Sequence, residues 1–232
     1  MLENCIEVSY LPWLKKVSIF KELNDEALKK LEEITETIYY NEEDLIFETG
    51  EDAEALYIIK TGQIRIEQVY RDGRKKTLAY LADSDFFGEM AIITKESRCA
   101  RAVSAKSSEL FRIEKSSFLE CLKNNSDLCF GILQVLCERL QTADSEISNL
   151  TFRNLPGRIV YKLFELAEQF GEPCSDGTLI KLSVTHYDLA DMVGTNRESV
   201  SKYISRFKKE GSIQINQKNI TILDRNKLLS WT

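Results

Sequence analysis

The segment from Phe86 to Val103, FFGEMAIITKESRCARAV, carries side chains that are suited to binding a sugar phosphate. Gly88 and Glu89 begin a short predicted helix whose free amides could bind an anion, and Arg98 is placed to return toward the same point. Its guanidinium offers a fixed fork of donors for a phosphate. A carboxylate beside a phosphate is repulsive unless it accepts hydrogen bonds, for example from a ribose hydroxyl. The segment therefore predicts a sugar-phosphate site, and the alternative is that Glu89 and Arg98 pair and close a loop.

A second segment, residues 189–209, has the pattern of a helix-turn-helix motif. Its sequence, LADMVGTNRESVSKYISRFKK, places Gly194 where a left-handed residue can close one helix. Thr195 or Asn196 then offers a side chain that can cap the next helix. Apolar residues recur in that second helix at helical spacing, at Val200, Ile204 and Phe207.

The second helix of this motif also carries polar side chains that can read DNA bases. In a helix-turn-helix, the first turns of this helix enter the major groove. Arginine and lysine suit guanine edges, and glutamate suits the cytosine amino group. The alternative is a helical hairpin that binds no DNA and whose charged face is only solvated. The candidate residues are Asn196, Arg197, Glu198, Ser199 and Lys202.

The charge distribution supports a nucleic-acid-binding module in the C-terminal part. The chain has a net charge of −6. Residues 152–232 hold 12 Lys and Arg against 9 Asp and Glu, whereas residues 1–151 hold 19 against 28. A basic segment joined to an acidic one fits a DNA-binding module attached to a part that does not touch DNA. No Walker loop, metal-binding cluster or nucleophile elbow appears and the chain has 1 histidine, so no enzyme is expected.

Length, hydropathy and cysteine usage indicate two ordinary domains. The 232 residues are 43% hydrophobic, which is enough for two cores. No stretch approaches the roughly 20 apolar residues that cross a bilayer, and the N-terminus MLENCIEVSY lacks a basic start followed by an apolar run. We therefore expect a cytoplasmic protein without a membrane partner. The cysteines form no C-x-x-C pair, and we expect most to be buried free thiols. They are Cys5, Cys99, Cys121, Cys129, Cys137 and Cys174.

The patterns around the sugar-phosphate segment predict elements that would position it. Residues 10–38 predict a small helical cap, and residues 39–113 predict an antiparallel β barrel or jelly roll. The expected β segments are LIFETG, ALYIIKTGQIRIEQVY, KKTLAYL, RAVSA and ELFRI. Glycines are expected at strand ends, at Gly50, Gly62 and Gly73, and Arg71-Asp72-Gly73 predicts a hairpin. After the helix-turn-helix, residues 213–215 and 220–222 predict the paired strands of a wing.

Residues 126–150 predict one long helix with a heptad seam. Such a seam needs a partner. Its length and regularity favour a parallel homodimer over packing against the protein's own β domain. A dimer would present two recognition helices to a two-fold symmetric DNA site, about one helical turn apart. The seam residues are Cys129, Leu133, Leu136, Leu140, Ala143, Ile147 and Leu150.

Two motifs resemble those of a known family. GEMAIITKESR closely resembles the phosphate-binding cassette of cyclic-nucleotide-binding domains, and TNRESVSK resembles the recognition helix of the Crp/Fnr superfamily of bacterial transcription regulators. The junction NLTFRNLPGRIVYKLFELAE resembles that family's hinge and first DNA-binding helix. The resemblance implies an α+β fold with three parts. These are an effector-binding β jelly-roll domain with a helical cap over residues 1–125, a dimerisation helix over 126–151 and a winged helix-turn-helix domain over 152–232.

The same resemblance implies an allosteric mechanism. Effector binding would change how the β domain packs on the long helix, and the DNA-binding domains would rotate about a hinge near residues 152–156. Pro156 is expected to break the long helix or begin the next one, and Gly157 to loosen the joint. The DNA half-sites would be TGTGA-like, and the loop 172–177 would contact RNA polymerase. The implied effector-pocket residues are Gly88, Glu89, Met90, Arg98, Cys99, Ala143 and Asp144.

The sequence is compatible with more than one class of effector. The cassette favours a cyclic nucleotide, but Cys99 replaces the usual Ser, Thr or Ala, and Ala143 and Asp144 replace the Thr-Ser pair of cyclic-AMP regulators. A haem sensor needs an axial ligand near the β region, where no histidine stands, although cysteine or other ligands are an alternative. An iron–sulfur sensor needs several cysteines near the N-terminus, where only one stands. The remaining alternatives are oxidation of Cys99 and an empty pocket that a Glu89–Arg98 pair would close.

Overall fold

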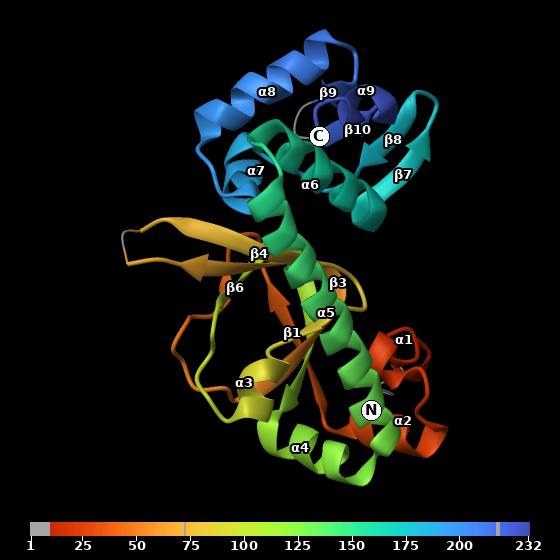
Figure 1. Ribbon diagram of the computed structural model, residues 1–232. Coiled ribbons are helices and arrows are strands. Elements are labelled where there is room, and N and C mark those ends of the chain that lie inside the picture. Colours follow the sequence, from red (N-terminus) through yellow and green to blue (C-terminus); the bar gives the residue numbers. More distant parts are fainter. Residues whose placement is uncertain (1–9, 72, 217–218) are drawn as a thin grey trace. The chain divides into compact units, whose positions relative to one another are not determined.

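The structure, a computed structural model, describes residues 10–71, 73–216 and 219–232. The fold is α+β, as the sequence predicts, and the chain divides into two compact units between Leu140 and Gln141 (Figure 1). Within the described ranges, no helix is both long enough and apolar enough to span a bilayer.

The first unit is built on one antiparallel sheet. Its strands are β1 (Thr35–Tyr40), β2 (Leu45–Phe47), β3 (Ala55–Val69), β4 (Lys75–Leu81), β5 (Phe86–Phe87) and β6 (Arg101–Glu114). The strand order is β1-β6-β3-β4, with β2 added to β6 and β5 added to β3. The long strands β3 and β6 pair along most of their length and form the centre of the sheet. The predicted antiparallel β architecture is therefore confirmed.

Two details of the predicted β region are wrong. The segments RAVSA and ELFRI form one continuous strand, β6, which accommodates its irregularities by register shifts against β3. Gly62, expected at a strand end, lies inside β3 beside such a shift. The predicted hairpin between β3 and β4 is confirmed, and the Tyr70 amide donates to the Arg74 carbonyl at 2.8 Å. Asp72 of this turn lies outside the described residues.

The helical elements of the first unit before residue 126 are short. They are α1 (Leu11–Leu14), the 3-10 turn η1 (Ser18–Phe20), α2 (Asp25–Glu33), α3 (Glu89–Thr94) and α4 (Lys115–Asn124). The predicted helical cap is wrong over residues 35–38, which belong to β1. Thr35 to Tyr40 carries β-branched and aromatic side chains and pairs in register with β6, so pairing with a distant strand overrides the local helical spacing.

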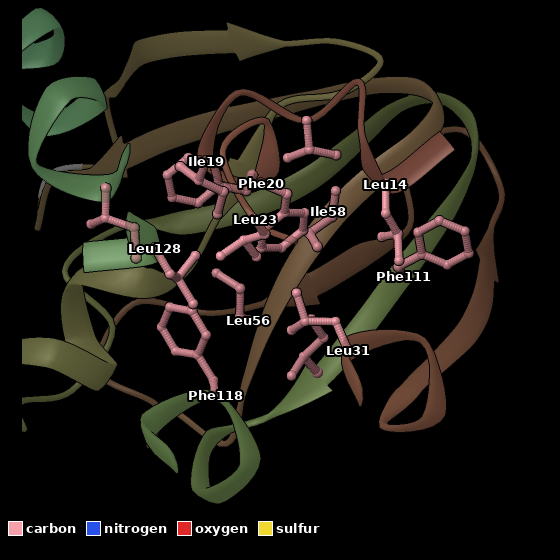
Figure 2. Close-up of a cluster of buried hydrophobic side chains, with 14 of the residues drawn as sticks. Leu14, Ile19, Phe20, Leu23, Leu31, Leu56, Ile58, Phe111, Phe118 and Leu128 are labelled. Carbon is pink, nitrogen blue, oxygen red and sulfur yellow. The ribbon is translucent and has the colours of Figure 1, made fainter. Parts of the chain in front are cut away.

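Two apolar clusters lie on opposite faces of β3, because alternate residues of a strand point to opposite sides. In the larger cluster Leu31 of α2 and Phe118 of α4 point toward Leu56 of β3 (Figure 2). In the smaller cluster the rings of Tyr57 and Phe87 are stacked with their centroids 5.3 Å apart. Phe87 is the last residue of β5, directly before the predicted cassette. The smaller cluster therefore anchors the start of that segment.

The predicted long helix is confirmed as α5, which spans Ser126–Phe152. Its predicted seam is only partly right. Leu128 and Ile132 are buried in the core of the first unit and Leu136 packs against that core, so one face of α5 belongs to the unit's own β domain. The side chain of Leu150 lies outside the described residues. The predicted seam residues Leu133, Leu140 and Ile147 are exposed, and together with Phe130, which was not part of the predicted seam, they form an apolar stripe that is 57–62% exposed.

The second unit combines helices with a four-stranded antiparallel sheet. The helices are α6 (Leu155–Phe170), α7 (His186–Val193), α8 (Arg197–Lys209) and α9 (Arg225–Leu229). The strands are β7 (Gly171–Cys174), β8 (Gly177–Ile180), β9 (Ile213–Asn216) and β10 (Asn219–Ile222), in the order β7-β8-β10-β9. The predicted wing strands are confirmed, with Ile213 opposite Ile222. Residues 172–177, expected to be a loop, are mostly strand and form the β7–β8 hairpin.

The junction between α5 and α6 is tighter than the sequence predicts. Asn154 caps α6, and its side chain accepts a 2.9 Å hydrogen bond from the Gly157 amide. Pro156 lies in the first turn of α6, where a missing amide proton has no consequence, so of its two predicted roles it begins the next helix. Gly157 is buried, and a side chain there would press on Asn154 and on the backbone of Thr232. It is a packing position and does not loosen the joint.

Candidate functional site

The predicted cassette, residues 88–99, runs from β5 through α3 to the start of β6. Gly88 caps α3 in the left-handed region, with φ of 87°, a conformation that residues with a side chain rarely adopt. Glu89 begins α3 and is buried, whereas Met90 is half exposed. The turn thus directs Glu89 inward, toward the side where Arg98 returns.

Arg98 is buried, with 4% of its surface exposed. Its Nη1 donates to the Gly88 carbonyl at 2.6 Å and its Nη2 donates to the Ala55 carbonyl at 2.7 Å. The guanidinium lies 4.1 Å from the centroid of the Phe47 ring. Its Nε is buried and has no hydrogen-bond partner. Burial lowers the pKa of Arg98, which expresses the cost of holding this cation away from water.

Glu89 pairs with Arg139 of α5, not with Arg98. Arg139 Nη1 donates to Glu89 Oε1 at 2.7 Å, and its Nη2 donates to the Phe86 carbonyl at 2.7 Å. The predicted alternative of a Glu89–Arg98 pair is therefore wrong. Burial raises the pKa of Glu89, and the nearby charge of Arg139 opposes that rise. Burial likewise raises the pKa of the neighbouring Asp85 carboxyl, and Arg139 again opposes it.

Arg139 is a candidate functional residue that the sequence reasoning missed. It lies at helical spacing from Leu128 and Ile132, on the face of α5 that packs on the β domain. A charged residue on an otherwise buried stripe was the available signal. Its side chain is 34% exposed, so it bridges the buried carboxylate of Glu89 and solvent. It links the cassette directly to the long helix.

The other predicted effector-pocket residues are exposed. Cys99 follows the buried Arg98 but is itself exposed, and Ala143 and Asp144 are exposed on α5. The role of these three as effector contacts stays a prediction. The expectation that most cysteines are buried is wrong for the described ones, since Cys99, Cys137 and Cys174 are exposed and Cys121 and Cys129 are half buried. Cys5 lies outside the described residues.

The helix-turn-helix is formed by α7 and α8. Thr185 caps α7 in a capping box with Asp188, and Gly194 ends it in the left-handed region with φ of 67°. Asn196, one of the two predicted caps, is the N-cap of α8 and accepts a 2.8 Å hydrogen bond from the Ser199 amide. The predicted apolar face is confirmed, because three residues of α8 are buried: Val200, Ile204 and Phe207.

The opposite face of α8 presents the predicted DNA-contacting side chains. Arg197, Glu198 and Lys202 are exposed, as is the capping residue Asn196, and Ser199 is half buried. The Arg197 guanidinium lies 5.0 Å from the ring centroid of Tyr187 in α7. Such a fixed helix, buried on one side and polar on the other, has the form of a recognition helix.

Comparisons with known proteins match both units. Residues 37–125 match the family described as cyclic nucleotide-binding domain, and residues 157–231 match the Crp-like helix-turn-helix domain. The Global nitrogen regulator of Nostoc sp. is 30% identical over 76% of this chain and 80% of that protein. The cAMP-activated global transcriptional regulator CRP of Pasteurella multocida is 30% identical over 79% and 88%. Among solved structures, FixK2 from Bradyrhizobium japonicum superposes with a TM-score of 0.76 and is 19% identical. The match covers 85% of this chain and 97% of the FixK2 chain.

Proposed function

Because this chain belongs to the Crp/Fnr family of DNA-binding transcription regulators, we propose that a small anionic effector bound at the cassette controls its affinity for DNA. The observation that carries this proposal is the buried guanidinium of Arg98. It bonds two carbonyl groups, but no carboxylate in the described part of the chain forms an ion pair with it. A buried charge is costly unless it is compensated. A bound anion would supply the missing negative charge.

The effector class that fits best is a cyclic nucleotide. Its phosphate would compensate Arg98, and a ribose hydroxyl would donate to the buried carboxylate of Glu89. The relatives' names include regulators of nitrogen and regulators activated by cAMP, so the family alone does not choose the effector. A haem is a weaker candidate, because the single histidine, His186, begins α7 in the other unit.

A second candidate is a regulator that needs no effector. It is favoured by one observation, that the two buried charged residues of the cassette already have partners within the protein. Glu89 is paired with Arg139, and Arg98 donates to the carbonyl groups of Gly88 and Ala55. In this case the Glu89–Arg139 pair would permanently close the pocket.

Transmission of the effector signal would run through Arg139. A ribose hydroxyl that donates to Glu89 would change or replace the bond from Arg139, which is part of α5. The helix α5 ends at Phe152, and the cap of α6 follows at Asn154. A change in the orientation of α5 would therefore pass along the chain to the DNA-binding domain. The domain limits that we propose are residues 1–125, 126–151 and 152–232.

We further propose that the exposed stripe of α5, Phe130, Leu133, Leu140 and Ile147, forms a parallel homodimer. Four large apolar side chains at coiled-coil spacing are favourable only when a partner covers them. Replacing Leu140 with lysine should convert the dimer to a monomer in sedimentation equilibrium. Ser145→Lys, exposed on another face of the same helix, is the matched control. A dimer that survives Leu140→Lys would contradict this arrangement.

On DNA, Arg197 and Lys202 would read guanines and Glu198 a cytosine. A dimer would then bind a two-fold symmetric site with TGTGA-like half-sites. Asn196 and Ser199, at the start of α8, would lie near the DNA backbone. The β7–β8 hairpin, residues 171–180, is the proposed contact for RNA polymerase. This last assignment rests on its position in the family only.

The effector proposal is tested by calorimetric titration of the full-length protein with cyclic AMP and with cyclic GMP. Saturable binding that Arg98→Ala abolishes would support the cassette as a nucleotide sensor. Lys95→Ala, an exposed cation of the same segment, is the matched control and should bind as the wild type does. Absence of binding by the wild type, together with intact DNA binding, would favour the regulator that needs no effector. Thermal unfolding of each variant checks that the loss does not come from misfolding.

A further inference from the structure

The ring of Tyr187, in the first helix of the helix-turn-helix, lies beside the guanidinium of Arg197, at the start of the second helix. Tyr187 of α7 is 62% exposed. The Arg197 guanidinium, at the start of α8, lies 5.0 Å from its ring centroid. We propose that Tyr187 is a positioning residue, which holds Arg197 in the orientation that reads a base and so determines specificity.

The two helix starts that carry this contact are held by hydrogen bonds. The His186 Nδ1 and the Ser201 hydroxyl lie 2.8 Å apart, which ties the first turn of α7 to the second turn of α8. The capping box of Thr185 fixes the start of α7, and the cap of Asn196 fixes the start of α8. The backbone at Tyr187 therefore has a defined place relative to the backbone at Arg197, and the two side chains start from fixed positions.

The contact suits base reading because it restrains the guanidinium without using its donors. A guanidinium stacks on an aromatic ring through its flat face, so the N–H groups at its edge stay available for a bidentate contact to guanine. No carboxylate in the described residues forms an ion pair with Arg197. An exposed arginine loses rotamer freedom when it binds, and a ring that already restricts it reduces that loss.

This inference rests on the proposed role of Arg197, and its test uses the full-length protein. Wild type, Tyr187→Leu, Tyr187→Phe and Arg197→Ala are each used to select duplexes from a library with a randomised half-site, with cyclic AMP present. The base position whose preference disappears in Arg197→Ala is the one that Arg197 reads. At that position, Tyr187→Leu should lower the preference by about two- to fivefold, the range of an exposed cation–π contact. Tyr187→Phe, which keeps the ring, should retain most of it.

Three outcomes of the selection would overturn the inference. The first is an unchanged preference at that position in Tyr187→Leu. The second is a loss of affinity in Tyr187→Leu that is equal on all sequences. If Tyr187→Phe shows the same equal loss, the hydroxyl binds the DNA backbone. The third is an Arg197→Ala variant that changes no base position, which would remove the proposed role of Arg197 as well. The first two leave that role intact, so the two failures are distinguishable.

A second measurement needs no DNA. The ring of Tyr187 should shift the Nε–Hε resonance of Arg197 in an NMR spectrum of the free protein, with the resonance identified by its loss in Arg197→Lys. Tyr187→Leu should move this resonance toward the position of a solvated arginine, and Tyr187→Phe should not. An Arg197 resonance that is already at the solvated position in the wild type would overturn the inference.

Discussion

The cassette and the recognition helix both carry charged side chains that contact a ligand in our proposal, but they hold these side chains in opposite ways. Glu89 and Arg98 are buried, and their partners Arg139 and Ala55 lie 50 and 43 residues away along the chain. Arg197 is exposed, and its ring contact lies within the same helix-turn-helix.

This difference indicates how each region would respond to its ligand. An effector at the cassette has to compete with hydrogen bonds that the protein already makes, so its binding is coupled to rearrangement of those bonds. In our proposal DNA meets Arg197 and Lys202 on α8, and these two side chains form no internal hydrogen bond or ion pair in the described residues. A region of the first kind suits a switch, and a region of the second kind suits discrimination between sequences.

The largest expected effect is on stability, from Arg139→Ala. Removing Arg139, which is 34% exposed, leaves the buried carboxylate of Glu89 uncompensated, and we expect a loss of about 3 kcal/mol at neutral pH, the lower end for a broken buried pair. The measurement is urea unfolding followed by the fluorescence of Trp13, whose ring contacts Phe111 in the core of the first unit. The double variant Glu89→Gln with Arg139→Met should recover most of the loss. An Arg139→Ala protein as stable as the wild type would show that the pair is not energetically important.

The free energy of unfolding that Arg139→Ala loses should depend on pH in a defined direction. Burial raises the pKa of Glu89, so the folded protein holds this proton more tightly than the unfolded chain does. The contribution of Glu89 to the free energy of unfolding is therefore fully present below the pKa of Glu89 in the unfolded chain. It is lost as the pH rises through the pKa of Glu89 in the folded protein. Without Arg139 the folded pKa rises further. The deficit of Arg139→Ala should therefore be small near about pH 4 and grow toward about pH 8 in urea unfolding.

At the recognition helix, the expected effect is on discrimination between DNA bases. Arg197→Ala should cost about 2 kcal/mol at one base position, because a bidentate contact to one base is lost. Its unfolding free energy should stay within about 0.5 kcal/mol of the wild type, because the side chain is exposed. Lys209→Ala, at the far end of α8, is the control and should change no single base position. A stability loss in Arg197→Ala comparable to that of Arg139→Ala would break the comparison between the two regions.

Local patterns in the sequence predicted the elements that depend on local physics. The spacing of Val200, Ile204 and Phe207 predicted α8, and the run from residue 126 predicted α5. The failures depend on distant partners. Thr35 to Tyr40 is a strand because β6 pairs with it, and the β7–β8 hairpin forms because β8 pairs with β10. Nothing within Thr35 to Tyr40 specifies its partner, whereas the β7–β8 turn includes Asp176-Gly177, a hairpin signal of the kind used for residues 71–73 that our prediction overlooked.

The two sites follow the same rule. Of the predicted DNA-contacting residues, Arg197, Glu198 and Lys202 are exposed on α8, where helical periodicity alone places them. In the cassette, the sequence motif predicted that Glu89 and Arg98 act together, but the partner of Glu89 is Arg139, which a distant helix supplies. Periodicity also could not predict that Cys99 is exposed, because its burial depends on what the segment between α3 and β6 packs against.

A smaller effect on stability is expected at Gly88 and Gly194, the glycines at positive φ in the cassette and in the turn of the helix-turn-helix. Gly88→Ala and Gly194→Ala should each cost about 1–2 kcal/mol of stability, since both adopt the left-handed conformation. At Gly88 an added Cβ would lie 2.6 Å from Arg98 Nη1, so the hydrogen bonds of Arg98 would also be disturbed. We expect Gly88→Ala to lose about 1 kcal/mol more than Gly194→Ala in urea unfolding. Equal losses would mean that Arg98 moves aside freely.

The smallest expected effect concerns Cys99. Because its thiol is exposed beside the buried Arg98, Cys99→Ser should change the unfolding free energy by less than about 0.5 kcal/mol. A hydroxyl is a stronger hydrogen-bond donor than a thiol, and one such neutral bond to a phosphate contributes about 1 kcal/mol. Cyclic AMP should therefore bind Cys99→Ser about fivefold more tightly in calorimetry, with Cys174→Ser of the other unit as the control. Unchanged affinity would place the phosphate away from Cys99.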